Sequence, residues 1–189
     1  MTDLFDTPGE TPPDTGAPRP LADRLRPQVL SDVIGQDQVL GSEAPLGVML
    51  ASGSLSSLVF WGPPGVGKTT VVGEIVNAAS FLGMQPLLAA PTGRAAKRLS
   101  EACNVEAKTI HRLLKWDPSR QGFVHNADYP LRGDMLIVDE VSMLDTLLAS
   151  RLFSALSRGT HVVIVGDQDQ LPSVGPGMVL RDMIASGFA

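Results

Sequence analysis

The residues best suited to chemistry lie in a glycine-rich stretch that follows an apolar run. The spacing G-x-x-x-x-G-K-[ST] is met by Gly62, Gly67, Lys68 and Thr69. Glycines let successive backbone N–H groups turn inward around an anion, lysine can reach the β- and γ-phosphates, and threonine can hold Mg²⁺. The alternative is a glycine-rich turn that matches by chance. We predict a nucleoside triphosphate site formed by Gly62, Pro63, Pro64, Gly65, Val66, Gly67, Lys68, Thr69 and Thr70.

Two adjacent carboxylates supply the second predicted half of this site. Asp139 and Glu140 directly follow the apolar run at residues 135–138. A carboxylate at the end of a buried strand can hold Mg²⁺ through water, opposite Thr69. Its neighbour can orient and deprotonate the water that attacks the γ-phosphate. We therefore assign Asp139 to magnesium and Glu140 to catalysis; the alternative is an acidic pair that only caps a strand.

Four apolar runs predict the strands that position these groups, near residues 58–61, 87–90, 135–138 and 162–165. Apolar residues at helical spacing follow each run. Their inward positions are Val72, Ile75, Val76 and Ala79; Ala96, Leu99 and Cys103; Ile110, Leu113 and Leu114; Leu144, Leu147, Leu148 and Leu152; and Val179, Leu180 and Ile184. The polar residues 117–134 predict a long loop or a small hairpin. We expect a three-layer α/β domain with a mainly parallel sheet, of the RecA-like P-loop type, with ligands at the carboxyl ends of the strands.

Composition limits the broad class of the protein. The 189 residues suffice for one domain with a real core. The net charge of −5 includes four acids and one arginine in the first twenty residues, so it does not exclude nucleic acid. One cysteine, Cys103, can form neither an intrachain disulfide nor a metal cluster, and we expect a buried thiol. No signal peptide or long apolar span is present, so we expect a cytoplasmic protein.

The first twenty residues contain five prolines and two glycines and predict a disordered leader. Its single apolar pair, Leu4-Phe5, can dock a partner protein or belong to a solvated tail. Residues 21–57 predict a short helical segment, with Ser31 as a helix N-cap. Residues 58–189 then form the main domain. A further strand after residue 189 would cover the first strand, at residues 58–61. Without that strand, residues 58–61 are expected to expose an apolar edge through which the chain can self-associate.

The segment from Leu21 to the phosphate loop resembles the start of AAA+ ATPases, above all the RarA/MgsA recombination-factor family. The likeness rests on residues 21–41, on Pro45-Leu46, and on Trp61-Gly-Pro-Pro-Gly-Val-Gly-Lys-Thr-Thr. It implies that the residues around Arg26-Pro27 and Val33-Ile34-Gly35-Gln36 lie against the adenine.

From Thr69 to Gly187 the sequence resembles the first motor domain of RecD-type superfamily-1 DNA helicases. Four stretches carry this likeness: residues 87–99 (LLAAPTGRAAKRL), 108–114 (KTIHRLL), 136–145 (LIVDEVSMLD) and 165–177 (VGDQDQLPSVGPG). The resemblance implies ATP hydrolysis with Mg²⁺, coupled to DNA in recombination or repair. It also implies that Gln170 senses the γ-phosphate and links it to the DNA groove, whereas Asp167 and Asp169 shape the turn. We expect the usual strand order, in which the first, third and fourth strands are central neighbours.

Polar residues after the second strand suit a nucleic-acid phosphate, because a hydroxyl, exposed N–H groups and a guanidinium open a helix there. The resemblance places single-stranded DNA at Thr92, Gly93 and Arg94, and near Thr109, His111 and Arg112. The alternative for Arg94, Lys97 and Arg98 is a solvated helix face paired with Glu101. Trp116 and Phe123 can stack on bases or pack beneath the 117–134 segment.

Three functions remain open. The first is the ATP- and DNA-binding motor domain of a RecD-like helicase, with weak or no activity alone, because the arginines that stabilise the transferred phosphoryl group belong to a second motor domain. The second is a RarA-like AAA+ recombination ATPase that acts as an oligomer. The third is a catalytically silent nucleotide-binding fragment or a chimera, since the two likenesses meet at the phosphate loop.

Overall fold

The computed structural model describes residues 44–52, 55–63, 65–119 and 121–187. The predicted leader, the Ser31 cap and the Arg26–Gln36 segment therefore lie outside the described residues, as does Pro64 of the phosphate loop. The first described helix, α3 (Pro45–Ser52), precedes the sheet.

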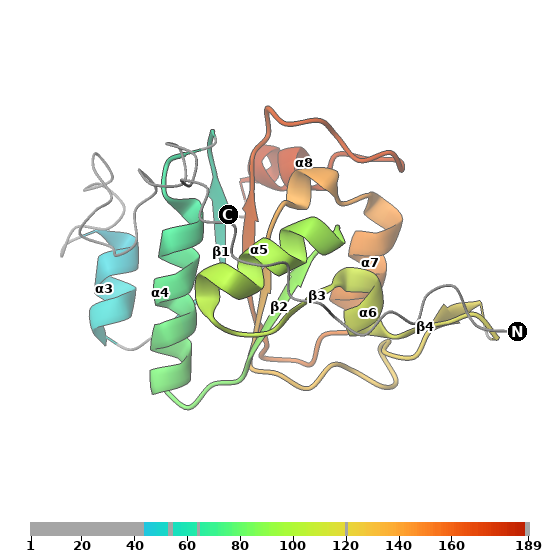
Figure 1. The fold of residues 1–189 in the computed structure, drawn as a ribbon, viewed down its shortest axis with the longest axis horizontal. Coiled ribbons are helices and arrows are strands. Elements are labelled where there is room, and N and C mark those ends of the chain that lie inside the picture. Colours follow the sequence, from blue (N-terminus) through green and yellow to red (C-terminus); the bar gives the residue numbers. More distant parts are fainter. Residues whose placement is uncertain (1–43, 53–54, 64, 120, 188–189) are drawn as a thin grey trace, which may run out of the picture.

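A five-stranded parallel sheet forms the centre of the fold, in the order β1-β7-β6-β2-β3 (Figure 1). Its strands are β1 (Leu58–Trp61), β2 (Pro86–Ala90), β3 (Ala107–Thr109), β6 (Met135–Val138) and β7 (His161–Gly166). The four predicted strands are confirmed, whereas β3 was not expected. The expected central position of the first strand is wrong for the described residues: β1 neighbours β7, which neighbours β6, but β1 lies at the sheet edge.

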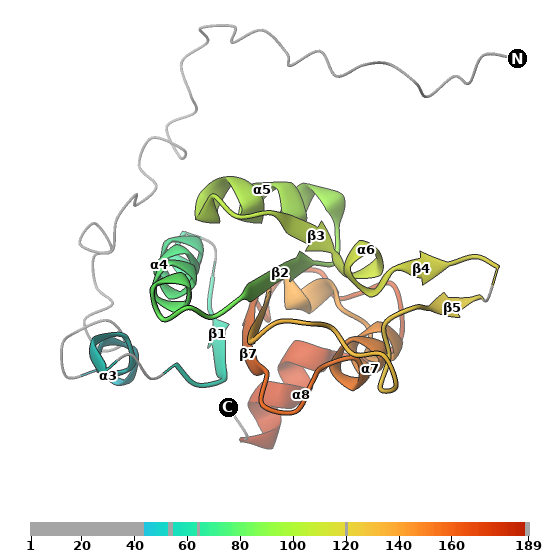
Figure 2. The same cartoon turned by 90° about the horizontal axis from the view of Figure 1, so that it is seen from below.

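Helices cover both faces of the sheet, which confirms the three-layer α/β fold. Figure 2 shows α4 (Lys68–Phe81) and α5 (Gly93–Cys103) on one face, with α6 (Ile110–Leu114), α7 (Thr146–Ser154) and α8 (Val179–Ser186) on the other. Side chains alternate between the faces along a strand. Met135 and Ile137 of β6 accordingly pack with α4, whereas Leu136 and Val138 pack with α6 and α7.

Most of the predicted helix faces are buried as expected. The inward residues of α4, α5 and α6 all lie in the core. Cys103 is buried, and burial together with the nearby charge of Asp139 raises the pKa of its thiol to about 11.

The predicted apolar stripe of α7 needs correction. Leu147 is 69% exposed, and the buried Leu144 lies before the helix, after a 3-10 turn at Val141–Met143. The helix begins only at Thr146, because the Asp145 side chain accepts a hydrogen bond from the Leu148 N–H (2.8 Å) as its N-cap. The predicted helical spacing fails because Leu144 precedes the helix and is separated from it by the Asp145 cap.

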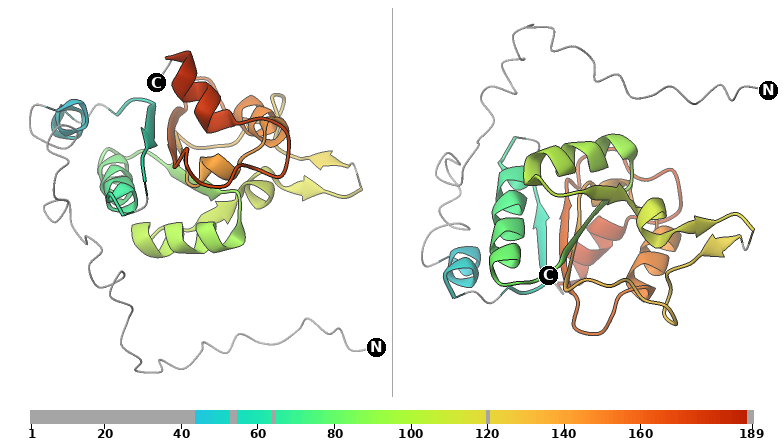
Figure 3. Two further views of the ribbon diagram at one scale, coloured as in Figure 1. Left: turned by 90° about the horizontal axis from the view of Figure 1, so that it is seen from above. Right: turned by 60° about the horizontal axis from the view of Figure 1, so that its bottom comes forward.

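The polar segment after α6 contains a small antiparallel hairpin, β4 (Trp116–Asp117) and β5 (Gly122–Phe123), which projects from the body of the domain (Figure 3). Trp116 lies opposite Phe123, and their rings pack edge to face with 5.0 Å between the ring centroids. Packing between the two rings is thus present, although Trp116 remains 49% exposed.

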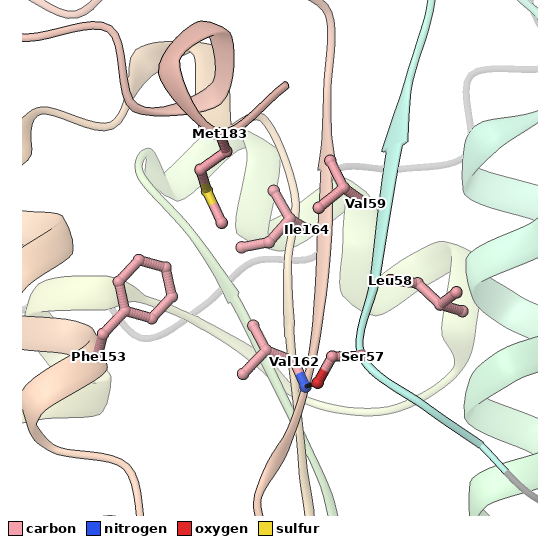
Figure 4. A pocket seen from close by; sticks show the side chains of 7 residues that line it. All are labelled: Ser57, Leu58, Val59, Phe153, Val162, Ile164 and Met183. Carbon is pink, nitrogen blue, oxygen red and sulfur yellow. Dashed lines mark hydrogen bonds between the residues drawn. The ribbon is translucent and has the colours of Figure 1, made fainter. Parts of the chain in front are cut away.

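The predicted apolar edge is present at β1, which pairs with β7 and has no second neighbour in the described sheet. An apolar pocket of about 280 Å³ lies between β1 and β7 on one side and α7 and α8 on the other (Figure 4). It is lined by Ser57, Leu58, Val59, Phe153, Val162, Ile164 and Met183. No helix among the described residues combines the length and apolarity needed to span a bilayer.

Candidate functional site

The glycine-rich loop joins the carboxyl end of β1 to the amino end of α4, as predicted. Gly65 has φ +87° and Gly67 has φ +83°, and both values lie in the left-handed region that other residues rarely adopt. Gly67 is the N-cap of α4, so the loop turns directly into the first turn of a 14-residue helix. The unpaired N–H groups and the dipole at such a helix start attract an anion.

Lys68 lies across this loop. Its Nζ donates to the carbonyl oxygen of Pro63 (2.8 Å) and to that of Gly62. Burial lowers the pKa of the Lys68 ammonium, while the negative charges of Asp167 and Asp139 oppose that shift. The structure therefore brings the lysine of the loop together with two carboxylates from other strands.

Asp139 follows β6 and lies half-buried at the carboxyl end of the sheet. Its N–H donates to the Ala89 carbonyl (3.0 Å), and its Oδ1 accepts from the Glu140 N–H (2.8 Å). Burial raises the pKa of Asp139 and the Glu140 charge adds to that rise, while the Glu140 N–H, Lys68 and Arg98 oppose it.

Thr69, in the first turn of α4, and Asp139 together offer a hydroxyl and a carboxylate oxygen. Oxygen ligands of this kind suit Mg²⁺, which keeps several waters and binds through one or two protein groups plus phosphate. Within the described ranges, no group of three or more His, Cys, Asp or Glu residues could hold a metal ion without such phosphates. The residues present therefore fit a magnesium ion that is bound together with a nucleotide.

Glu140 has φ +54° and ψ +41°, a left-handed conformation that is uncommon for a residue with a side chain. A hydrogen bond from the Met143 N–H to the Glu140 carbonyl (3.0 Å) holds this turn. The Glu140 Oε1 lies 3.9 Å from the Arg98 Nη1 of α5. This contact joins two segments that sequence analysis did not connect.

Asp167 and Gln170 follow β7. Asp167 is only 2% exposed, and its carboxylate accepts hydrogen bonds from the Asp169 N–H (3.0 Å) and from the Gln170 Nε2 (3.3 Å). Asp167 thus shapes the turn, as expected, and fixes the Gln170 amide. Sequence analysis missed that the charge of Asp167 also acts on the Lys68 ammonium; its position directly after a buried strand was the available signal.

The predicted DNA-binding residues gather at the carboxyl ends of β2 and β3, which pair in parallel with Ala90 opposite Thr109. Thr92 is the N-cap of α5 and Thr109 is the N-cap of α6. The side chains of Arg94, His111 and Arg112 are exposed.

The alternative interpretation, a solvated basic face paired with Glu101, holds for one of its three residues. The Lys97 Nζ lies 4.0 Å from the Glu101 Oε1, and the Lys97 side chain is 78% exposed. Arg98 pairs with Glu140 instead.

Comparison with known proteins supplies the family context. Residues 50–176 match the model of a family described as AAA domain. The ATP-dependent RecD2 DNA helicase of Deinococcus radiodurans is 46% identical over 123 residues, covering 65% of this chain and 17% of its own length. The RecBCD enzyme subunit RecD of Mycolicibacterium smegmatis is 38% identical over 150 residues, covering 67% of this chain and 27% of its own.

A further relative extends over more of the chain. An uncharacterised AAA domain-containing protein of Mycobacterium tuberculosis is 31% identical over 176 residues, covering 90% of this chain and 34% of its own length. The chain thus spans between 17% and 34% of these relatives. Among solved structures, one of Pif1 helicases on forked DNA has a TM-score of 0.47 and 22% identity, covering 75% of this chain and 36% of that chain.

Proposed function

Because this chain belongs to the AAA domain family and carries a RecD-like superfamily-1 helicase motor domain, we propose that it binds and hydrolyses ATP with Mg²⁺ and couples hydrolysis to DNA. One observation carries the proposal. Lys68 opens the helix that follows β1, Asp139 follows β6 and Asp167 follows β7, and the charges of both carboxylates act on the Lys68 ammonium. The carboxyl edge of a parallel sheet is where ligands bind in open α/β folds.

Each part of the site has a role in this reaction. The backbone N–H groups of Gly65, Gly67 and Lys68 would face the phosphates, and the Lys68 ammonium would exchange the Pro63 carbonyl for the β- and γ-phosphates. Thr69 and Asp139 hold Mg²⁺, which when bound neutralises charge on the phosphates.

Two further side chains act at the γ-phosphate. Glu140 orients the attacking water and accepts its proton. Gln170, whose amide donates to the Asp167 carboxylate, senses the γ-phosphate and relays its state toward the DNA.

The DNA lies across the starts of α5 and α6. The Thr92 hydroxyl already accepts from the Ala95 N–H (3.2 Å), which orders the first turn where Gly93 and Arg94 meet a phosphate. Thr109, His111 and Arg112 extend this surface. The relative from Deinococcus radiodurans is named as a DNA helicase, and single-stranded DNA is the partner we propose in recombination or repair. Turnover by these 189 residues alone is slow, because the resemblance assigns the stabilising arginines to a second motor domain.

A second candidate is favoured by the relative that covers 90% of the chain. In this alternative, the RarA/MgsA likeness of the sequence before the phosphate loop reflects an AAA+ ATPase, and the protein acts as an oligomer. Sedimentation with and without Mg-ATP tests it. A nucleotide-dependent ring-sized assembly supports the AAA+ role, whereas a monomer under both conditions contradicts it.

The proposed nucleotide site is tested by calorimetric titration with Mg-ATP. Lys68→Ala removes the ammonium that the loop positions, so we expect binding to be lost or weakened at least tenfold, roughly the value of one charge-assisted phosphate contact. Lys97→Ala, which removes an equal charge from an exposed ion pair, serves as the control and leaves binding unchanged. A wild-type chain that does not bind Mg-ATP would falsify the proposal.

A further inference from the structure

Arg98 lies between the proposed DNA surface and the proposed catalytic glutamate. It belongs to α5, the helix that begins at Thr92 and Gly93, and its Nη1 lies 3.9 Å from the Glu140 Oε1. The Arg98 side chain is 55% exposed and that of Glu140 is 28% exposed, so both reach solvent near the site. The charge of Arg98 also acts on Asp139.

The backbone fixes where Glu140 starts but not where its carboxylate points. Its left-handed conformation and the Glu140 N–H to Asp139 Oδ1 bond hold the main chain. The three side-chain torsions of a glutamate remain to be set by contacts of the carboxylate. Among the described residues, Arg98 supplies the ion pair to that group.

Helix α5 is a rigid connection between the two sites. Its inward residues Ala95, Ala96, Leu99 and Cys103 are buried, and the helix packs against β2 and β3. Arg94 and Arg98 are four residues apart, and residues at that spacing lie on the same side of a helix. A DNA phosphate bound by Arg94 would therefore hold in place the side of α5 that also carries Arg98.

We propose that Arg98 is a positioning residue: it orients the Glu140 carboxylate toward the attacking water and transmits DNA binding at the start of α5 to hydrolysis. This inference rests on the proposed function. This role is specific to Arg98 and is not a general effect of the positive charges on α5. The neighbouring Lys97 pairs with Glu101 and not with Glu140. Lys97→Ala is therefore the matched control, with the same loss of charge from the same helix.

The test compares steady-state ATP turnover of the 189-residue chain with and without a single-stranded oligothymidine. In Arg98→Ala we expect kcat with DNA to fall about tenfold, since small misplacements of catalytic groups have effects of this order or larger. KM for ATP stays within about twofold, because the nucleotide contacts are intact. Arg98→Lys restores part of kcat, and Lys97→Ala behaves as wild type.

Where turnover is too slow to compare, the affinity for Mg-ADP with aluminium fluoride replaces kcat. This complex mimics the transferred phosphoryl group and its attacking water, so Arg98→Ala weakens it about tenfold relative to Mg-ADP. Two results overturn the role of Arg98 alone: an Arg98→Ala protein that matches Lys97→Ala, or one whose turnover without DNA rises. A wild-type chain that binds neither Mg-ATP nor DNA overturns the proposed function and this role with it.

Discussion

The loop after Gln170 rests on the start of α7, and Gly177 lies directly against Thr146. The Thr146 N–H donates to the Pro176 carbonyl (2.9 Å), and the Ser173 hydroxyl donates to the Gly175 carbonyl (2.9 Å). Gly177 has φ +95°. A Cβ added at Gly177 would overlap the Thr146 Oγ1 and come within 3.1 Å of the Thr146 Cβ. We therefore expect Gly177→Ala to strain the backbone and to displace the loop.

The expected loss of stability has two sources. An alanine held in the left-handed region costs about 1–2 kcal/mol. Forcing a methyl group against packed atoms costs a further ~1–3 kcal/mol. Gly159 offers a matched control, because it has φ +90° but nothing within 4 Å of an added Cβ. Gly159→Ala should therefore show only the backbone contribution.

Urea unfolding of the two variants separates these contributions. We expect Gly177→Ala to lower the free energy of unfolding by about 1–3 kcal/mol more than Gly159→Ala does. Adding Thr146→Ala, which removes the overlapping Oγ1, should recover part of that difference in a double-mutant cycle. Equal losses in the two glycine variants, or no recovery with Thr146→Ala, would refute the packing argument.

Three further outcomes are expected. Glu140→Gln removes the proposed base, so Mg-ATP binding persists while single-turnover hydrolysis slows by roughly 10²–10⁴-fold; unchanged hydrolysis would contradict the assignment. Burial raises the pKa of Asp139, so the folded protein holds that proton more tightly than the unfolded chain, and stability falls as pH rises from the ordinary value of 3.8 through the raised one. Asp139→Asn should thus raise the melting temperature of the nucleotide-free protein at pH 7, with a gain that fades toward pH 4, while Mg-ATP binding weakens; a variant less stable than wild type at pH 7 would argue against it. Arg94→Ala should weaken oligothymidine binding and reduce the slope of log affinity against log salt by about 1, and an unchanged slope would remove Arg94 from the DNA surface.

The parts of the site that lie close together in the sequence were predictable. Gly65 and Gly67 adopt left-handed backbone conformations that favour glycine, and the spacing of these glycines is visible in the sequence. Asp139 directly follows a fully buried strand. Both signals are local, so a single sequence displays them. The burial of Cys103 followed in the same way from helical spacing.

The parts that depend on contacts between distant segments were not predictable. Strand β3 has three residues and exists because it pairs with β2, which no local pattern indicates. The helical period through Leu147 failed because an Asp145 cap restarts the helix. The charge of Asp167 acts on Lys68, and Arg98 pairs with Glu140. Only the folded sheet brings these distant segments together.

The central claim is that one edge of this sheet couples ATP to DNA. The most direct test is the rate of ATP hydrolysis by the 189-residue chain as single-stranded oligothymidine is added. The account predicts a slow basal rate that rises with DNA and disappears, with or without DNA, in Lys68→Ala. A rate that is the same at every DNA concentration, in a chain that binds Mg-ATP, would contradict it.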